Sequence, residues 1–312
     1  MRILQTFQDL SDGDRGASAA IGNFDGVHLG HRKVIDLARQ AGRAIGAPLG
    51  VVTFEPHPRE VFAPDAPPFR LMNAEAKASR LAKIGVDRLY QLGFTPALAA
   101  LSAEEFARDV LAGGLGLRHV VVGADFRFGR GREGDVAMLD RLGRAHGYAT
   151  TVAPLLAAET RAVSSTAIRA ALAEGQTKAA RAMLGHWHRI EGPVIHGEKR
   201  GRELGYPTAN MSLDGLHLPR LGVYAVLVDV ISGPGTGRYH GVASLGVRPM
   251  FGENAPNLET HIFGFDGDLY GRHISVALVE WLRGEQKFDG LEALIAQMDR
   301  DSDAARGILA AL

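Results

Sequence analysis

Apolar residues in the first half of the chain alternate between short continuous runs and stripes with helical spacing. We expect strands in the continuous runs, at residues 17–21, 49–54, 88–94, 119–122 and 150–155. Residues 31–44, 76–84, 103–111 and 136–146 place apolar side chains three and four positions apart, as on one face of a helix. Alternating strands and helices predict a parallel sheet covered on both faces. Ligands of such sheets bind beyond the carboxyl ends of the strands.

The hydrophobic pattern changes after Gly185. Four β-rich runs follow, separated by Gly, Pro and Asp without a helical stripe between them, at residues 223–230, 239–245, 259–265 and 274–280. This spacing is typical of an antiparallel barrel or sandwich. The chain then ends in an amphipathic helix at residues 291–309, expected to cover the barrel with Leu291, Leu294, Ile295 and Met298. We therefore predict two domains, an α/β domain of residues 1–185 and an all-β domain of residues 186–312.

Composition narrows the classes of function. Thirty-five basic residues balance thirty-five acidic ones, so the basic excess typical of a nucleic-acid-binding protein is missing. The sequence has no cysteine, which excludes disulfides, thiolate metal sites and cysteine nucleophiles. It also lacks an apolar run of about 18 residues and a signal-peptide core near its first residue. We expect a cytoplasmic protein with no membrane span and no nucleic-acid partner.

A glycine- and histidine-rich segment lies between the first predicted strand and the helix that follows it. Gly22, Gly26 and Gly30 allow backbone to approach a ligand closely. His28 and His31 are three residues apart at the opening of the helix, where free amide donors and the helix dipole favour anions. The combination favours a polyphosphate site. The alternative is a turn that carries two surface histidines.

This segment is similar to the G-x-F-D-G-x-H-x-G-H signature of the nucleotidyltransferase superfamily, which has a Rossmann-like α/β fold. The resemblance implies that both histidines are catalytic, because they hold ATP phosphates and stabilise charge as pyrophosphate leaves. It assigns further ATP contacts to Gly22, Asn23, Phe24, Asp25 and Gly26.

A second segment, V-S-S-T-A-I-R at residues 163–169, resembles the late [IV]-S-S-T-x-[IL]-R segment of the same superfamily. The resemblance implies that Ser164, Ser165 and Thr166 meet phosphates and that Arg169 pairs with them as a catalytic cation. Taken alone, this segment is also a common helix cap.

Two segments between these motifs indicate which phosphorylated substrate is used. T-F-E-P-H-P at residues 53–58 and G-A-D-F-R-F-G at residues 123–129 resemble the F-[DE]-P-H-P and G-x-D-F-x-F-G segments of bacterial FAD synthetases. The resemblance implies a flavin site formed by Phe54, Phe62, Asp125 and Phe128. The alternative for the phenylalanines is simple core packing. No G-x-G-x-x-G fingerprint follows a strand and no P-loop is present, so hydride transfer and P-loop chemistry have no support.

The β-rich half carries G-R-E-L-G-Y-P-T-A-N at residues 201–210, similar to the riboflavin kinase signature G-R-x-L-G-[FY]-P-T-A-N. Thr208 and Asn210 alternate on a predicted strand, so both oxygens face one side and can bind Mg2+ together with nucleotide phosphates. The resemblance also implies that Glu259 is the catalytic carboxylate. The ATP contacts expected here are Gly197, Gly201, Arg202, Gly205, Pro207, Thr208 and Asn210. The alternative is a solvated turn followed by an edge strand.

Together these motifs resemble the prokaryotic bifunctional riboflavin kinase/FAD synthetase family over residues 17–310. The resemblance implies ATP-dependent phosphorylation of riboflavin to FMN, then adenylylation of FMN to FAD, with Mg2+ in both steps. Met250 and Gly264 depart from the family pattern. Three alternatives stay open: a single retained activity, a flavin- or nucleotide-binding regulatory protein, and a nucleotidyltransferase for another metabolite. Self-association is left open too.

Overall fold

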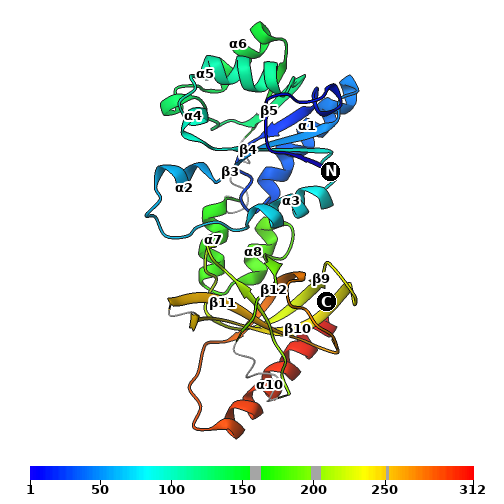
Figure 1. Cartoon of the computed structure of the whole chain (residues 1–312), viewed down its shortest axis with the longest axis vertical. Coiled ribbons are helices and arrows are strands. Elements are labelled where there is room, and N and C mark those ends of the chain that lie inside the picture. Colours follow the sequence, from blue (N-terminus) through cyan, green and yellow to red (C-terminus); the bar gives the residue numbers. More distant parts are fainter. Residues whose placement is uncertain (155–162, 198–204, 251–252) are drawn as a thin grey trace. The chain divides into compact units, whose positions relative to one another are not determined.

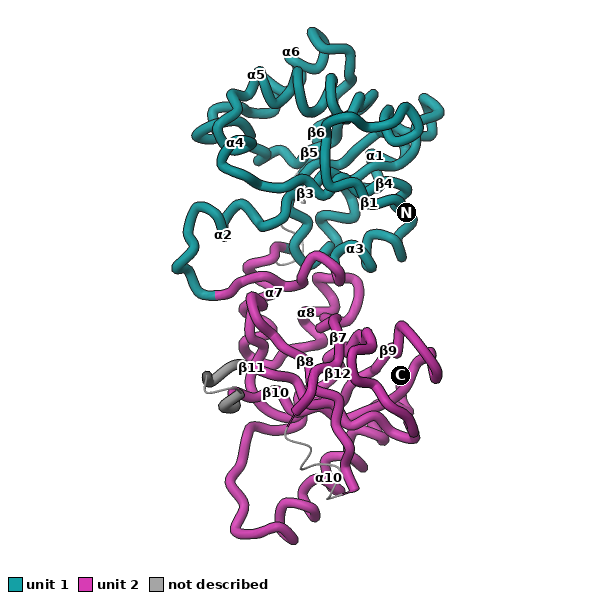
Figure 2. Tube along the Cα trace, viewed as in Figure 1, with its two compact units in different colours: residues 1–67, 77–163 teal, residues 68–76, 164–312 magenta. Residues whose placement is uncertain are grey.

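The computed structural model describes residues 1–154, 163–197, 205–250 and 253–312, with backbone only for residues 248–250 and 253–255. The chain forms two compact units, each with its own sheet and core (Figure 2). The first contains residues 1–67 and 77–163, and the second contains residues 68–76 and 164–312. No helix of the described residues is long and apolar enough to cross a membrane.

The first unit is built on a six-stranded parallel sheet with strand order β1-β4-β3-β2-β5-β6 (Figure 1). This confirms the predicted parallel sheet. Its strands are β1 (Arg2–Leu4), β2 (Ser18–Ile21), β3 (Leu49–Glu55), β4 (Arg88–Gly93), β5 (His119–Gly123) and β6 (Ala149–Ala153). The helices that accompany them are η1 (Asp12–Asp14), α1 (Leu29–Ile45), α2 (Pro58–Phe62), α3 (Ala74–Lys83), α4 (Pro96–Ala99), α5 (Ala103–Glu105), the π-helix η2 (Phe106–Gly114), η3 (Arg130–Arg132) and α6 (Val136–His146).

Strand β2 lies at the centre of this sheet and is buried on both faces. Ala19 and Ile21 pack into the main hydrophobic core with η2 and α6, whereas Ser18 faces α1 and donates a hydrogen bond to the carbonyl of Ala38 at 2.8 Å. Helix α1 approaches closely at Gly42, where a Cβ atom would lie only 3.1 Å from that of Ser18. Small residues on strand and helix therefore set the distance of α1 from the sheet.

The described part of the second unit contains two helices followed by a six-stranded antiparallel sheet of order β7-β12-β9-β10-β11-β8. Its elements are α7 (Ser165–Ala173), α8 (Thr177–Leu184), β7 (Arg189–Pro193), β8 (Ala209–Ser212), β9 (Gly222–Val230), β10 (Gly237–Met250), β11 (Glu253–Ile262), β12 (His273–Arg283) and α10 (Leu291–Ala310). Ile195, just after β7, bridges Asn210 of β8, so the sheet almost closes on itself. This confirms the barrel alternative of the sequence prediction.

Helix α10 packs through its second half, which corrects the predicted contact face. Leu291 is 56% exposed, whereas Ala305 and Leu309 are buried against residues of β9 and β12. Asp301 is also buried and accepts three hydrogen bonds from the guanidinium of Arg283, at 2.7 to 3.0 Å. The other three residues of the predicted contact face, Leu294, Ile295 and Met298, are only partly buried. The second half of the terminal helix is therefore held by buried apolar residues and by the ion pair of Asp301 with Arg283.

We predict that Asp301→Ala destabilises the second unit by about 3 kcal/mol, because it leaves the mostly buried Arg283 without its carboxylate. Urea unfolding followed by tryptophan fluorescence measures this, since Trp187 and Trp281, the only tryptophans of the chain, both lie in this unit. The matched control is Asp303→Ala, whose pair with Arg306 is exposed and should contribute less than about 1 kcal/mol. Equal effects of the two substitutions would contradict the role of the buried pair.

Candidate functional sites

The glycine- and histidine-rich segment leaves the carboxyl end of β2, where the strand order of the first sheet reverses. The turn that joins β2 to α1 contains Phe24 and Val27 at φ of 51° and 41°, in the left-handed region that side chains rarely adopt. Gly26 adopts φ of 86° between them. This strained turn places the histidines at the first residues of α1.

His28 is the N-cap of α1, and its Nδ1 accepts a hydrogen bond from the backbone amide of His31 at 3.2 Å. The accepting role at Nδ1 assigns the proton of the neutral ring to Nε2. The two imidazoles stack with centroids 3.5 Å apart, and the ring of Phe24 meets His31 edge-on at 5.3 Å. Both predicted histidines are therefore held rigidly side by side.

Burial keeps both imidazoles neutral. It lowers the pKa of His28 from 6.5 to about 4. The pKa of His31 is lowered mainly by burial and further by electrostatic coupling to His28 and Lys77. Neutral rings can each donate one hydrogen bond to an anion without the electrostatic cost of a buried charge.

The S-S-T-x-x-R segment opens α7 in the second unit, whereas the histidine motif belongs to the first. Ser164 caps α7, because its Oγ accepts the amide of Ala167 at 3.2 Å. The Nε of Arg169 donates to the carbonyl of Phe69 at 2.6 Å, and its guanidinium lies 5.5 Å from the centre of that ring. The capping alternative is thus present in the fold, and a phosphate contact from this segment stays a prediction.

The aromatic residues predicted to hold a flavin lie at or beyond the carboxyl ends of β3 and β5, and they share two ring neighbours. Phe54 and Phe62 both meet the ring of Phe94 edge-on, at 5.7 and 5.6 Å. Phe54 and Phe128 both contact Phe106. Phe62 is 71% exposed and Phe128 is buried, so this group runs from the core to the surface. Asp125 is exposed in the turn after β5.

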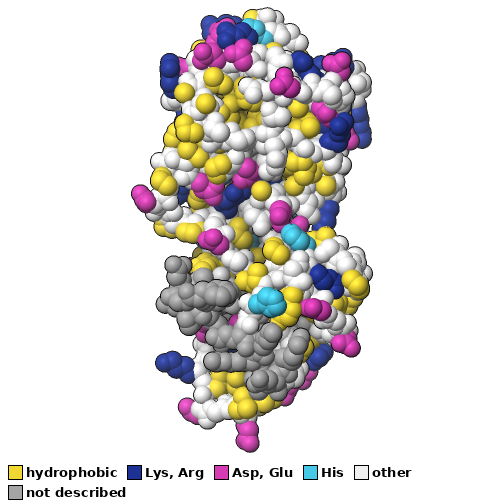
Figure 3. Space-filling model, viewed as in Figure 1, with side chains coloured by type: hydrophobic (Ala, Val, Ile, Leu, Met, Phe, Trp, Pro, Cys, Tyr) yellow, Lys and Arg dark blue, Asp and Glu magenta, His cyan; other side chains and the backbone are white. Residues whose placement is uncertain are grey.

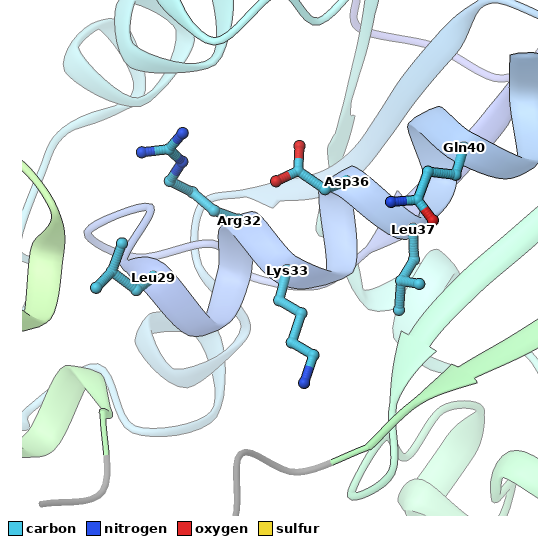
Figure 4. Close-up of a pocket in the computed structure, with 6 residues that line it drawn as sticks. All are labelled: Leu29, Arg32, Lys33, Asp36, Leu37 and Gln40. Carbon is cyan, nitrogen blue, oxygen red and sulfur yellow. The ribbon is translucent and has the colours of Figure 1, made fainter. Parts of the chain in front are cut away.

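Sequence reasoning did not single out Phe94 or Phe106, although Phe94 directly follows β4 and Phe54 lies one residue before the end of β3. It also missed Arg32 and Lys33, which come directly after His31. Together with Leu29, Asp36, Leu37 and Gln40 they line an open hollow of about 460 Å³ along one face of α1 (Figure 4). The signal available in the sequence was their position directly after the histidine motif, on the same predicted helix.

The second unit has a hollow of about 330 Å³ at the barrel. Pro207 and Thr208 of the predicted kinase segment line it, together with Thr260 and residues 265–270. Gly197 lies against Asn210, because a Cβ at Gly197 would come within 2.6 Å of the amide nitrogen of Asn210. Gly205 has φ of 79° and is exposed. The predicted contacts Gly201 and Arg202 lie outside the described residues.

Glu259 occupies the middle of a row across three strands. In β11 it pairs with Ser244 of β10 on one side and with Asn210 of β8 on the other. Directly paired residues of antiparallel strands project from the same face, so the carboxylate lies beside the amide of Asn210. Asn257 donates a hydrogen bond to Glu259 from two residues away, at 3.3 Å. The structure thus brings together the predicted carboxylate and one predicted metal ligand.

Among the described residues, no three acidic or histidine side chains cluster in a way that could hold a metal ion. The oxygens of Thr208 and Asn210 suit Mg2+, a hard cation that keeps several waters and takes most of its charge from nucleotide phosphates. On the face drawn in Figure 3, acidic and basic side chains of the described residues are interspersed.

Two family models match the chain. The FAD synthetase model covers residues 11–167, and the riboflavin kinase model covers residues 184–309. The chain is 42% identical to a bifunctional riboflavin kinase/FMN adenylyltransferase of Pseudomonas fluorescens over 99% of its length and 98% of the relative. It is 41% identical to the protein of that name from Escherichia coli K12, over 98% of its length and 97% of the relative. A crystal structure titled macrolide-efflux protein, from Streptococcus pneumoniae, is similar with TM-score 0.81, 30% identity and 98% of both chains covered.

We predict that acidification destabilises the first unit between pH 6.5 and about 4, because only the unfolded chain then binds a proton at His28. Above this window His28 is neutral in both states, and below it His28 is protonated in both. The shift corresponds to about 3 kcal/mol. Thermal unfolding followed by circular dichroism should show a smaller acid loss for His28→Asn, which keeps a side-chain cap. Tryptophan fluorescence tracks the second unit separately, and identical pH profiles for both proteins would contradict the prediction.

Proposed function

This chain belongs to the bifunctional riboflavin kinase/FMN adenylyltransferase family, and on that premise we propose how its residues divide the two activities. Riboflavin kinase activity converts riboflavin to FMN, and FMN adenylyltransferase activity converts FMN to FAD. We assign the first to residues 186–312 and the second to residues 1–185. The observation that carries this division is that the carboxylate row and the histidine pair lie in different compact units. Residues 164–185 pack with the second unit and are assigned to adenylylation by their sequence segment alone.

In the kinase step a neutral ribityl hydroxyl must attack the γ-phosphorus of ATP. We assign Glu259 to orient this hydroxyl and to accept its proton during the attack. Support comes from its place beside Asn210 and from the hydrogen bond that Asn257 donates to it. We propose that ATP enters near the hollow lined by Pro207 and Thr208, with Gly197, Gly201, Arg202 and Gly205 as further contacts.

In the adenylylation step the nucleophile is the phosphate of FMN, already an anion at neutral pH. No general base is needed, and the protein has to position the phosphates and stabilise the departing pyrophosphate. The neutral ring of His28 offers an Nε2–H donor, and the first amides of α1 and the helix dipole add to it. His31 supplies the second ring, and residues 22–26 supply backbone contacts. Arg169 and the hydroxyls of Ser164, Ser165 and Thr166 are proposed as further phosphate contacts.

We propose that Mg2+ accompanies ATP at the kinase site, held by Thr208 and Asn210. When bound it offsets charge on the β- and γ-phosphates. For FMN we propose a site bounded by Phe54, Phe62, Asp125 and Phe128, supported by the ring contacts that Phe94 and Phe106 make with these phenylalanines. The cytoplasmic location and the lack of a nucleic-acid partner stay predictions from composition. Chromatography of flavins after incubation with riboflavin, ATP and Mg2+ tests the whole proposal, which fails if neither FMN nor FAD appears.

We expect Glu259→Gln to lower the rate of FMN formation from riboflavin by about 100-fold or more, because the amide accepts no proton. Conversion of added FMN to FAD should continue at the normal rate. Separate assays starting from riboflavin and from FMN measure the two effects. The control is Glu292→Gln at the exposed start of α10, which should change neither rate. Loss of both activities in a folded variant would refute independent sites.

We expect His28→Asn to lower FAD formation by about 100-fold, because it removes the Nε2–H donor while keeping a helix cap. FMN should then accumulate when riboflavin is supplied. The control, His240→Asn, lies exposed in the second unit and should leave both steps unchanged. Normal FAD production by the His28 variant would overturn the phosphate-binding role.

A further inference from the structure

A buried lysine lies behind the histidine motif and has no part in the chemistry assigned above. The side chain of Lys77, on α3, is 2% exposed. Burial of an ammonium group is strongly unfavourable unless hydrogen bonds and an opposite charge offset it. Its position in the first unit therefore requires specific partners.

Within the part of the chain that the structure describes, the ammonium group lies close to three acceptors from neighbouring elements. Its Nζ lies 2.7 Å from Oε1 of Glu55, 3.2 Å from Oγ1 of Thr53 and 3.3 Å from the backbone carbonyl of Asn23. An ammonium group has three N–H donors and can therefore engage these acceptors together. Thr53, fully buried, in turn donates from Oγ1 to the same carbonyl of Asn23 at 3.2 Å. Lys77 and Thr53 thus both donate a hydrogen bond to the carbonyl of the same peptide group.

That peptide group begins the strained turn. Asn23 precedes Phe24, whose φ of 51° is unfavourable for a residue with a side chain, and Val27 repeats the strain before His28. Such conformations persist only where the surrounding structure imposes them. The ring of Phe24 also lies edge-on against His31, so a shift of the turn would move the histidine pair.

We infer that Lys77 is a positioning residue for adenylylation, because its ammonium group fixes the Asn23 carbonyl and thereby the turn that aims His28 and His31. The inference rests on the proposed adenylyltransferase role of the histidines. Its cation also lies near enough to help lower the pKa of His31, which keeps that ring neutral. The alternative is that Lys77 only neutralises the mostly buried carboxylate of Glu55.

The two roles separate in a Glu55→Gln background, where a neutral amide replaces the carboxylate of Glu55. We compare Glu55→Gln with Glu55→Gln/Lys77→Met in the full-length chain, since methionine approximates the length of lysine without its donors. The added Lys77→Met change should lower kcat for FAD formation from FMN by about tenfold or more, because small misplacements of catalytic groups are costly. KM for ATP should change by less than about threefold, since binding contacts remain.

Circular dichroism at the assay temperature establishes that both variants are folded, and riboflavin phosphorylation by the same samples should be unchanged. The single variant Lys77→Met, which keeps the mostly buried carboxylate of Glu55, should lose stability as well as kcat. Equal kcat values for Glu55→Gln and the double variant would overturn the positioning role and leave charge neutralisation. Failure of the wild-type chain to make FAD would instead overturn the proposed function, so the two failures are distinguishable.

Discussion

The first site depends on a single hydrogen bond, from the amide of His31 to Nδ1 of His28. Most helices begin with a serine, threonine, aspartate or asparagine, whose oxygen performs this capping role. A histidine at this position caps the helix through Nδ1, and its Nε2 is left to donate to a ligand. The bond also assigns the tautomer, because an accepting Nδ1 requires the proton on Nε2. Helix start, ring orientation and donor position are therefore consequences of one contact.

The two sites place their polar groups in different environments. Burial lowers the pKa of His28 and of His31 so that both rings are neutral. Neutral rings suit hydrogen-bond donation to an anionic substrate, whose reaction needs no general base. Glu259 lies only partly buried on a strand face, beside neutral amides of Asn210 and Asn257. We propose that a carboxylate at this place orients the substrate hydroxyl and accepts its proton. The proposed division of chemistry between the units rests on this difference in surroundings.

Much of the fold could be predicted from hydrophobic spacing, because buried parallel strands need continuous apolar runs and amphipathic helices need a stripe. The prediction for α6 matches its bounds, and the strands of the first half agree within about two residues. Strand β1 was missed, since its three residues are largely exposed and carry no apolar run. Residues 103–111 were predicted as one helix, but the structure changes from α to π geometry at Phe106, and spacing alone does not separate these forms.

The sequence by itself determined the order of the two modules, the motif segments and the predicted histidine pair, because these depend on local spacing and residue chemistry. The predicted role of Glu259 came from the family resemblance of its segment. Only the tertiary structure decided that Asp301 and Leu309, rather than Leu291, anchor the last helix. It alone brought Lys77 of α3 to the Asn23 carbonyl, and Phe94 and Phe106 to Phe54. The physical reason is that burial and partners come from segments distant along the chain. Those neighbours decide whether a buried charge, such as that of Lys77, is neutralised. They also decide whether an aromatic ring, such as that of Phe54, packs in the core or faces a ligand.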